Sequence, residues 1–488
     1  MDMDFADFIL EHDGDDLGRL ALARGRFASH VEDFDLALTT LECRRKLRDK
    51  VPEWYAVPSL RYPLRVSGEQ CSSSATARYK AAVAVSVVES KDSRRSSEHP
   101  AGPGTFAAAK VVEGEKAAGD NRGQSPLKPG RIADLTGGLG VDSWAFAQVF
   151  DEVLYNEMRP ELAQAARHNF AALGMGNITV SNYALAPASH NSSDILNEAA
   201  VSPILGDFRP SIIFLDPARR SSDGRKVFRL EDCQPDVLQL LHELFAACPL
   251  LLLKLSPMAD ISLVCKQLGC VRDVHVVCSE GECKELLLLL ERGYNGEYGL
   301  TVYDNGAIMP LDQVHPLSGR GYILGAGPSP GTVPQTPMEA IVDGLGPGGK
   351  SGLSPNLPWT RSTGGDLGEM ILFEPGKGLL KAGAFDLPCR YGLEKLGRHT
   401  HLYVGESVPE ELRPFGKVFR VLEALPLNNR NIKAVGQKYP QAEVTARNIP
   451  LTSDQLRAKL GVRSGGTVHI FGVQVDASAS HWLIIAQK

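Results

Sequence analysis

The feature that most constrains the fold is a regular alternation of short apolar stretches and helix-like stretches between residues 131 and 293. Seven apolar stretches are predicted to be strands, because branched apolar residues dominate them. In chain order they read RIADL, EVLYNE, NITVSN, SIIFLDP, LLLLKLSP, VRDVHVV and ELLLLLER. Amphipathic patterns such as PELAQAARHNFAALG lie between several of them. This alternation predicts an α/β domain with a mainly parallel sheet, whose last two strands form an antiparallel pair at one edge.

Two stretches of biased composition divide the rest of the chain. Residues 89–128 are rich in Ser, Gly, Pro, Lys and Glu and are predicted to be a disordered insertion. Residues 323–368 are rich in Gly, Pro and Ser and are predicted to be a linker. Residues 1–88 carry apolar residues at helical spacing, so we expect a helical N-terminal domain with a helix that ends near Val51, before Pro52.

Composition excludes several classes of protein. Hydrophobic residues make up 43% and charged residues 23%, as in globular proteins, and no apolar run is long enough to span a bilayer. The acidic N-terminus lacks the basic region of a signal peptide, so we expect a cytoplasmic protein with no membrane partner. The nine cysteines form no C-x-x-C pair, so neither a metal site nor a disulfide framework is expected. The net charge of −6 means that any binding to nucleic acid depends on a local basic patch.

A glycine-rich turn, DLTGGLGVD at residues 134–142, follows the first predicted strand. A P-loop needs a lysine after the turn, and none is present. A dinucleotide fingerprint needs a third glycine where Ser143 stands. An acidic strand end followed by two spaced glycines fits S-adenosylmethionine (SAM) better: Asp134 can accept from the ammonium of the methionine moiety, while Gly138 and Gly140 let the backbone approach the cofactor.

Two further predicted strands end in acidic residues. Glu157 ends the second predicted strand, 17 residues after Gly140. A carboxylate at this position can accept hydrogen bonds from both ribose hydroxyls of the cofactor. The alternative interpretation of Glu157 is a solvated acidic residue at the start of a helix. The fourth strand ends in the sequence Asp216-Pro217-Ala218-Arg219-Arg220, which exposes a polar group at the cleft, with arginines that can bind phosphate or carboxylate. The alternative is a capping turn with two surface arginines.

The fifth strand brings Lys254, Ser256 and Pro257 to the same cleft, and we expect Lys254 to make a structural ion pair.

Several long motifs occur in an order that resembles a bacterial family of class I SAM-dependent methyltransferases with a THUMP-like C-terminal domain. In the central region they are DLTGGLGVD, FLDPARRSSDGRKVFRLEDCQPDV, KLSPMADI, VHVV and ECKELLLLL. Outside it they are EQCSSSATARYKA, EPGKGLLKAGAFDLPCRYGLEKLGRHTHLYVGES, FGKVFRVLE and TARNIPLTSDQLRAKLGVRSGGTVHIFG.

The resemblance implies a Rossmann-like, seven-stranded class I methyltransferase core with a helical N-terminal domain and an α+β C-terminal region, ferredoxin-like plus THUMP-like. The expected segments are a methyltransferase domain at 129–296, a connecting segment at 297–322, a ferredoxin-like segment at 369–410 and a THUMP-like domain at 411–488. It also implies methylation of RNA, such as tRNA or rRNA, at a base nitrogen.

By the same resemblance, one group of residues lines the SAM site: Asp134, Thr136, Gly138, Gly140, Asp142 and Glu157. A second group faces the methyl group and its acceptor: Asp216, Pro217, Arg219 and Arg220. After the third strand the family has an aspartate near adenine, whereas this chain reads VSNYALAP. Asn182 is the expected substitute, and Asp207 is a second candidate.

The acceptor turn departs from the Asn/Asp-Pro-Pro-aromatic pattern that is typical of RNA methyltransferases that modify exocyclic amines. Asp216-Pro217 is kept, but Ala218-Arg219 replaces the rest, so base stacking needs another residue or an arginine plane. C5 methylation of pyrimidines needs a cysteine nucleophile, and Cys283 lies outside the usual place. Transfer to nitrogen is therefore favoured, with oxygen as the alternative.

The EQCSSS stretch, which contains Ser72, has no readable histidine partner and is expected to cap a helix.

Three other functions stay open from sequence. They are methylation of a small molecule or a protein, RNA binding by a non-catalytic protein that keeps a SAM fold, and NAD-dependent oxidation, which the missing third glycine disfavours. Basic residues of the C-terminal part could contact phosphates or form an ordinary solvated face. They are Lys377, Lys381, Arg390, Lys395, Arg398, Arg430, Lys433, Lys438, Arg447, Lys459 and Arg463.

Overall fold

The structure, a computed structural model, describes residues 4–28, 30–65, 67–96, 130–187, 198–219, 229–311, 370–476 and 480–488. The chain forms two compact units, one built mainly from residues before 302 and one built mainly from residues after 321. Each unit is described by itself.

Residues 302–311, which include the last strand of the first sheet, are grouped with the second unit. The first unit is built mainly on this nine-stranded sheet, which has the order β13-β12-β10-β11-β9-β6-β1-β2-β3. Its strands are β1 (Arg131–Asp134), β2 (Glu152–Asn156), β3 (Ile178–Ser181), β6 (Ile212–Leu215), β9 (Leu250–Leu255), β10 (Val271–Ser279), β11 (Glu282–Glu291), β12 (Gly299–Asp304) and β13 (Ala307–Pro310). The strands β3, β2, β1, β6 and β9 pair in parallel, and β11 runs antiparallel to β9. The predicted α/β core with a mainly parallel sheet is confirmed.

The sheet extends further than the sequence prediction. The expected edge pair, β10 and β11, is not at the edge, because β12 and β13 continue the sheet beyond β10. These two strands come from the segment 297–322 that was expected only to connect domains. Asn305 and Gly306 form the two-residue loop between them, both with positive φ, as a tight hairpin of this twist requires. The Asn-Gly pair was the sequence signal for this hairpin.

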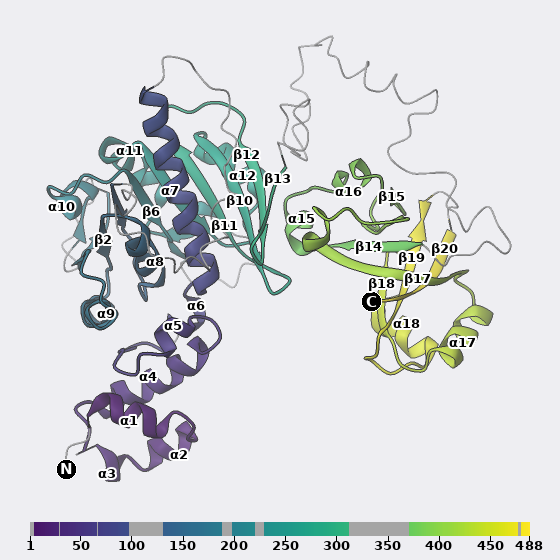
Figure 1. Cartoon of the computed structure of the whole chain (residues 1–488), viewed down its shortest axis with the longest axis horizontal. Helices are drawn as coiled ribbons and strands as arrows, with labels where there is room; N and C mark the ends of the chain where they lie inside the picture. The colour runs from purple at the N-terminus through teal and green to yellow at the C-terminus, as the bar shows by residue number, and fades with distance from the viewer. Residues whose placement is uncertain are drawn as a thin grey trace, which may run out of the picture. The chain divides into compact units, whose positions relative to one another are not determined.

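Helices cover the sheet and follow the predicted pattern. They are α7 (Ser74–Ser96), α8 (Val141–Val149), α9 (Pro160–Ala172), α10 (Val201–Leu205), α11 (Val237–Ala247) and α12 (Ile261–Leu268). The long helix α7 lies beside α8 and crosses one face of the sheet (Figure 1). Because α7 continues to Ser96, the start of the predicted insertion 89–128 is helical, and residues 97–128 lie outside the described residues.

Short elements complete the first unit. The parallel pair β4 (Ala184–Leu185) and β5 (Glu198–Ala199), the antiparallel pair β7 (Ala218–Arg219) and β8 (Cys233–Gln234), and the 3-10 helix η2 (Leu230–Asp232) lie in its loops.

The N-terminal region is helical, as predicted. Its elements before α7 are α1 (Phe5–His12), α2 (Leu17–Leu22), α3 (Arg24–Phe27), α4 (Phe34–Leu47), α5 (Pro52–Tyr55) and α6 (Ser67–Gln70). Asp4, Asp16 and Asp33 cap α1, α2 and α4 by accepting backbone amides, which explains where these helices begin. The break before Pro52 is also found: α4 ends at Leu47, and Pro52 begins α5.

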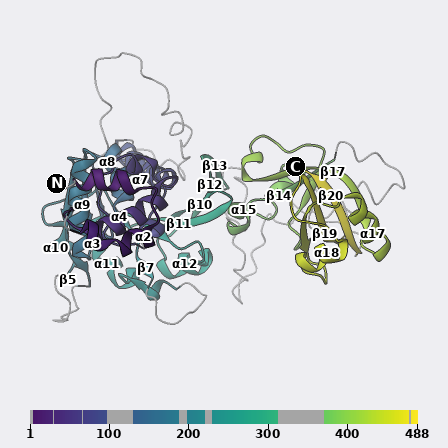
Figure 2. The ribbon, with the colours of Figure 1, turned by 90° about the horizontal axis from the view of Figure 1, so that it is seen from below.

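The second unit is built on one seven-stranded sheet with the order β15-β16-β14-β17-β20-β19-β18. Its strands are β14 (Ile371–Pro375), β15 (Glu394–Lys395), β16 (Tyr403–Gly405), β17 (Gly416–Pro426), β18 (Glu443–Arg447), β19 (Val468–Val475) and β20 (Ser480–Gln487). Its helices are α15 (Lys377–Lys381), α16 (Leu387–Arg390), the 3-10 helix η3 (Arg413–Phe415), α17 (Asn429–Lys438) and α18 (Ser453–Leu460). The helices α17 and α18 lie on one side of the sheet (Figure 2).

The strand β14 pairs antiparallel with β17 over five residues, from Ile371 opposite Arg420 to Pro375 opposite Gly416. The strands of the two predicted C-terminal segments, ferredoxin-like and THUMP-like, therefore share one sheet.

Candidate functional site

Acidic residues meet at one edge of the first sheet. Asp134 is the last residue of β1, while Glu157 and Asp216 directly follow β2 and β6. These strands are parallel neighbours, so their carboxyl ends lie together. The chain order reverses between β1 and β6, and ligands of open α/β sheets bind in the crevice at such a point.

The two spaced glycines of the turn have different neighbours. Gly140 has φ +95°, and a Cβ atom placed there would lie 2.7 Å from the buried ring of Phe170. Gly138 has φ +54°, but a Cβ atom there would meet nothing closer than 3.9 Å. The carbonyl of Gly138 accepts from the Tyr155 hydroxyl at 2.6 Å. Gly140 is therefore needed for packing, whereas Gly138 borders open space in which a ligand can approach the backbone.

Asp134 lies beneath this turn and is only 1% exposed. Its Oδ1 atom accepts the amide of Thr136 at 3.1 Å, and its Oδ2 atom accepts the hydroxyl of Ser143 at 2.6 Å. Burial raises the pKa of Asp134 to about 8, although the bond from Ser143 acts in the opposite direction. Both carboxyl oxygens thus brace the turn, and contact with a cofactor ammonium stays a prediction.

Glu157 also supports the turn. Its Oε2 atom accepts the amide of Gly138 at 2.8 Å, and its Oε1 atom accepts the amide of Arg159 at 2.9 Å. Burial raises its pKa, and these amide bonds partly offset the increase. A carboxylate has about four acceptor positions, so Glu157 can still accept ribose hydroxyls. The Nδ2 atom of Asn182 donates to the carbonyls of Glu157 and Met158 at 2.6 and 3.2 Å, and so fixes the loop after β2.

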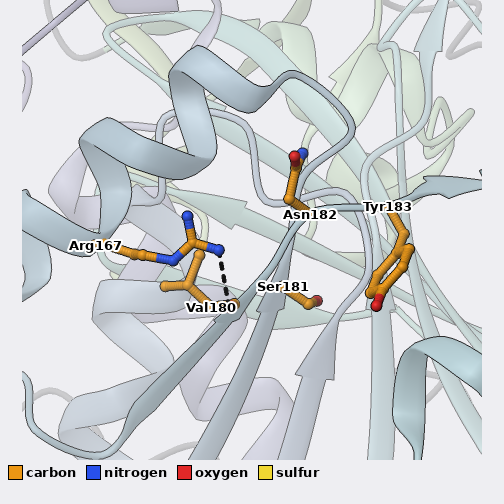
Figure 3. A pocket seen from close by; sticks show the side chains of 5 residues that line it. All are labelled: Arg167, Val180, Ser181, Asn182 and Tyr183. Carbon is orange, nitrogen blue, oxygen red and sulfur yellow. Dashed lines mark hydrogen bonds between the residues drawn. The ribbon is translucent and has the colours of Figure 1, made fainter. Parts of the chain in front are cut away.

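Asn182 also borders a shallow pocket of about 370 Å³ at the end of β3 (Figure 3). The pocket is lined by Arg167, Val180, Ser181, Asn182 and Tyr183. The Arg167 guanidinium donates to the Val180 carbonyl at 3.4 Å, and Tyr183 is 40% exposed. This hollow offers both polar groups and an aromatic ring.

Asp207, the second candidate for the adenine contact, is not part of this group. It is exposed and precedes β6, and its neighbour Phe208 packs 5.6 Å from the guanidinium of Arg131 at the start of β1. It therefore lies near the amino ends of the strands.

The acceptor turn is anchored to the glycine turn. The amide of Asp216 donates to the Thr136 hydroxyl at 2.6 Å. The Oδ2 atom of Asp216 lies 2.6 Å from the Nζ atom of Lys254, which confirms the ion pair expected for this lysine. Pro217 is buried, and the backbone of Arg219 lies in β7. The side chain of Arg219 and all of Arg220 lie outside the described part of the chain.

A buried polar network continues behind Asp216. Lys80, which is 0% exposed, lies 2.6 Å from Glu285, 3.2 Å from Asp142 and 3.0 Å from the Ser72 hydroxyl. Ser72 donates to Asp142 at 2.9 Å. Asp142, expected at the cofactor, is thus engaged by Lys80 of α7 and by Ser72, which precedes that helix.

Sequence reasoning missed Lys80 and Glu285, because the two are 205 residues apart in the chain.

The expected capping role of the serine stretch is confirmed: Ser73 and Thr76 exchange hydrogen bonds at the start of α7.

The network carries more acidic than basic groups. Two lysines (Lys80, Lys254) face three carboxylates (Asp142, Asp216, Glu285), a formal charge of −1. Burial acts to lower the pKa of Lys254, but the three carboxylates outweigh it and raise that pKa.

The residues that the structure describes contain no helix long and apolar enough to cross a membrane, and no cluster of three metal-ligating side chains.

Comparison with known proteins agrees with this architecture. Residues 416–488 match the THUMP domain-like family, and residues 372–412 match a ferredoxin-like domain family. Two proteins of Mycobacterium tuberculosis, from strains CDC 1551 and H37Rv, are 25% identical over 362 residues, which cover 72% of this chain and 80% of each relative. Both are described as uncharacterized S-adenosylmethionine-dependent methyltransferases.

A crystal structure of a proposed methyltransferase from Porphyromonas gingivalis W83 covers 100% of both chains, with a TM-score of 0.66 and 24% identity, which shows the same fold. The chain therefore has the same fold as that structure, is similar in sequence to S-adenosylmethionine-dependent methyltransferases over 72% of its length, and ends in residues that match the ferredoxin-like and THUMP domain-like families.

Proposed function

We propose that this methyltransferase modifies RNA, at a base nitrogen of tRNA or rRNA, and that its THUMP-like region binds the RNA. The observation that carries the proposal is the charge of residues 416–488. They contain ten lysines and arginines and four aspartates and glutamates, a formal charge of +6 in a chain whose total is −6. A basic segment on an acidic chain is the local patch that phosphate binding requires.

The distribution of these charges supports a binding surface. On α17, Arg430 and Lys433 are exposed and three residues apart, so they lie on one side of the helix. Lys459 at the end of α18 and Arg463 after it are exposed as well. Cations that project into solvent from neighbouring helices can contact successive phosphates.

The residues at the carboxyl edge of the first sheet fit SAM. This cofactor has a positive sulfonium, an ammonium and one carboxylate, and the network behind Asp216 has a formal charge of −1. The open space beside Gly138 suits a ligand that lies on the backbone, and Glu157 at the end of β2 suits ribose hydroxyls. When bound, SAM supplies an electrophilic methyl group.

Asp216 is the residue we assign to the acceptor. Its Oδ2 atom is bonded to Lys254, and we assign Oδ1 to accept an N–H or O–H from the group that is methylated. A carboxylate in an ion pair accepts hydrogen bonds and donates none, which favours an acceptor that carries a hydrogen, such as an exocyclic amine. Arg219 and Arg220 are proposed to bind the phosphate or base of the RNA.

The test is transfer of labelled methyl from SAM to total RNA from a strain that lacks this protein. We expect label in RNA with the native chain and none with Asp216→Ala. Asp151→Ala is the matched control, because Asp151 is exposed and precedes β2, at the opposite end of the strand. Nucleoside analysis of the labelled RNA then names the base and atom.

Two outcomes would redirect the proposal. Label that appears in a small-molecule or protein fraction, and not in RNA, would reassign the acceptor. The double variant Arg430→Glu/Lys433→Glu is expected to lose RNA labelling, whereas a small-molecule methyltransferase would keep its turnover. If SAM binds but no fraction is labelled, the protein is a non-catalytic one that retains the fold.

A further inference from the structure

Lys254 occupies a position with three acceptors around one ammonium group. Its Nζ atom lies 2.6 Å from Asp216 Oδ2, 3.4 Å from the Ser72 hydroxyl and 3.7 Å from Glu285 Oε2. The ammonium therefore donates hydrogen bonds to Asp216 and Ser72 and forms a longer ion pair with Glu285, and these contacts together restrict its position. The lysine side chain is 11% exposed, whereas that of Asp216 is 37% exposed. The lysine therefore lies behind the carboxylate, away from solvent.

A second layer holds these acceptors in turn. Lys80 contacts both Ser72 and Glu285, at 3.0 and 2.6 Å, and Ser72 donates to Asp142 at 2.9 Å. Ser72 precedes α7, Lys80 lies in α7, Asp142 lies in α8, and Lys254 and Glu285 lie in β9 and β11. Such a network, in which each charged group has a partner of opposite charge, restricts its members to one arrangement.

We propose that Lys254 is a positioning residue for Asp216, and that Ser72 and Glu285 hold Lys254 in place. The lysine fixes Oδ2, which leaves Oδ1 in a defined position for the acceptor. Without it, the Asp216 side chain would rotate, and the buried carboxylate of Glu285 would lose one of its cations. The inference rests on the proposed function, because it assumes that Asp216 serves the methyl acceptor.

The magnitude follows from the geometry of positioned reactions. A misplacement of about 1 Å at a reacting group costs about 100-fold in rate. We therefore expect Lys254→Met to lower kcat about 100-fold without raising the KM for SAM, since Lys254 is not assigned a cofactor contact and its loss makes the network more negative. Lys254→Arg keeps a cation and is expected to recover part of the rate. Lys266→Met is the control, because Lys266 is exposed on α12.

A double-mutant cycle separates positioning from a general structural role. If Lys254 acts through Asp216, then Lys254→Met causes no further loss of kcat in an Asp216→Asn background. Independent, multiplicative losses would overturn the proposal, and so would full activity of Lys254→Met. The stoichiometry of SAM binding corrects each rate for the folded fraction. Ser72→Ala, which removes one of the three acceptors, is a milder variant with an expected smaller loss of kcat in case Lys254→Met folds poorly.

Crystal structures of the full-length variants provide a test that needs no acceptor. The Asp216 carboxylate is expected to leave its native position in Lys254→Met and to keep it in Lys254→Arg. An unmoved Asp216 in the methionine variant would overturn the proposal. A native chain that binds SAM but labels no RNA would instead count against the proposed function, and the crystal comparison would still decide the role of Lys254.

Discussion

Replacement of Gly140 by alanine tests the account of the glycine turn. The residue has φ +95°, in the left-handed region, where an alanine costs about 1–2 kcal/mol. Its new Cβ atom would also lie 2.7 Å from Cζ and 3.0 Å from Cε1 of Phe170. That ring is 2% exposed and packs edge-on against Tyr155, so it cannot move aside without disturbing the core.

The two costs add. Overpacking of a well-filled core costs about 1–3 kcal/mol, so Gly140→Ala is expected to destabilise the first unit by about 2–5 kcal/mol. Gly174→Ala is the matched control, because Gly174 follows α9 with φ +71° and a Cβ atom placed there would have nothing within 4 Å. It incurs only the backbone cost, about 1–2 kcal/mol.

Hydrogen exchange read by mass spectrometry is the assay, because peptides from β1 and α8 report this unit separately from the C-terminal one. The opening free energy of these peptides is expected to fall further in Gly140→Ala than in Gly174→Ala. Equal losses in the two variants would refute the reasoning, since they would mean that Phe170 does not restrict the turn.

Three further predictions follow from the site. Gly138→Ala places a Cβ atom in open space and should weaken SAM binding in calorimetry. Its unfolding temperature should fall by no more than that of Gly174→Ala. A normal affinity for SAM would show that the cofactor does not lie beside Gly138. Burial raises the pKa of Asp134 to about 8, so the folded state keeps a proton that the unfolded chain loses above about pH 4. The free energy of unfolding should therefore fall by on the order of 5 kcal/mol as the pH rises from about 4 to 8. Urea unfolding of Asp134→Asn should lack this decline, and a parallel pH profile for the two proteins would contradict it. Lys80→Met leaves Glu285 buried without its closest cation and should cost about 3–5 kcal/mol, whereas the double variant Lys80→Met/Glu285→Leu should recover much of this loss in urea unfolding; additive losses would argue against coupling.

The sequence allowed all seven strands of the predicted core to be located, because each is an apolar run bounded by turn residues. The same reasoning missed the hairpin of β12 and β13, although Asn305-Gly306 marked it, since the segment lacks the strand–helix alternation that defined the domain. Periodicity finds elements whose pattern repeats, and an appended hairpin does not repeat.

The site was predicted unevenly for a physical reason. Residues at strand ends, such as Asp134, Glu157 and Asp216, can be located because parallel strands bring their carboxyl ends together. Which atoms they bind depends on side chains from distant segments. Asp216 pairs with Lys254, and Asp142 contacts Ser72 and Lys80. No local sequence pattern connects residues so far apart in the chain.

The pairing of β14 with β17 restricts how the two C-terminal segments, ferredoxin-like and THUMP-like, can be gained or lost in evolution. Sequence families divide the C-terminal half between residues 412 and 416, yet the ladder from Ile371 to Pro375 crosses that division. A chain that gained or lost one part alone would present an unpaired strand edge, which promotes aggregation. The two parts are therefore expected to be acquired and lost together in evolution, and gene fusions that join at residue 370 should be tolerated where fusions at residue 413 are not.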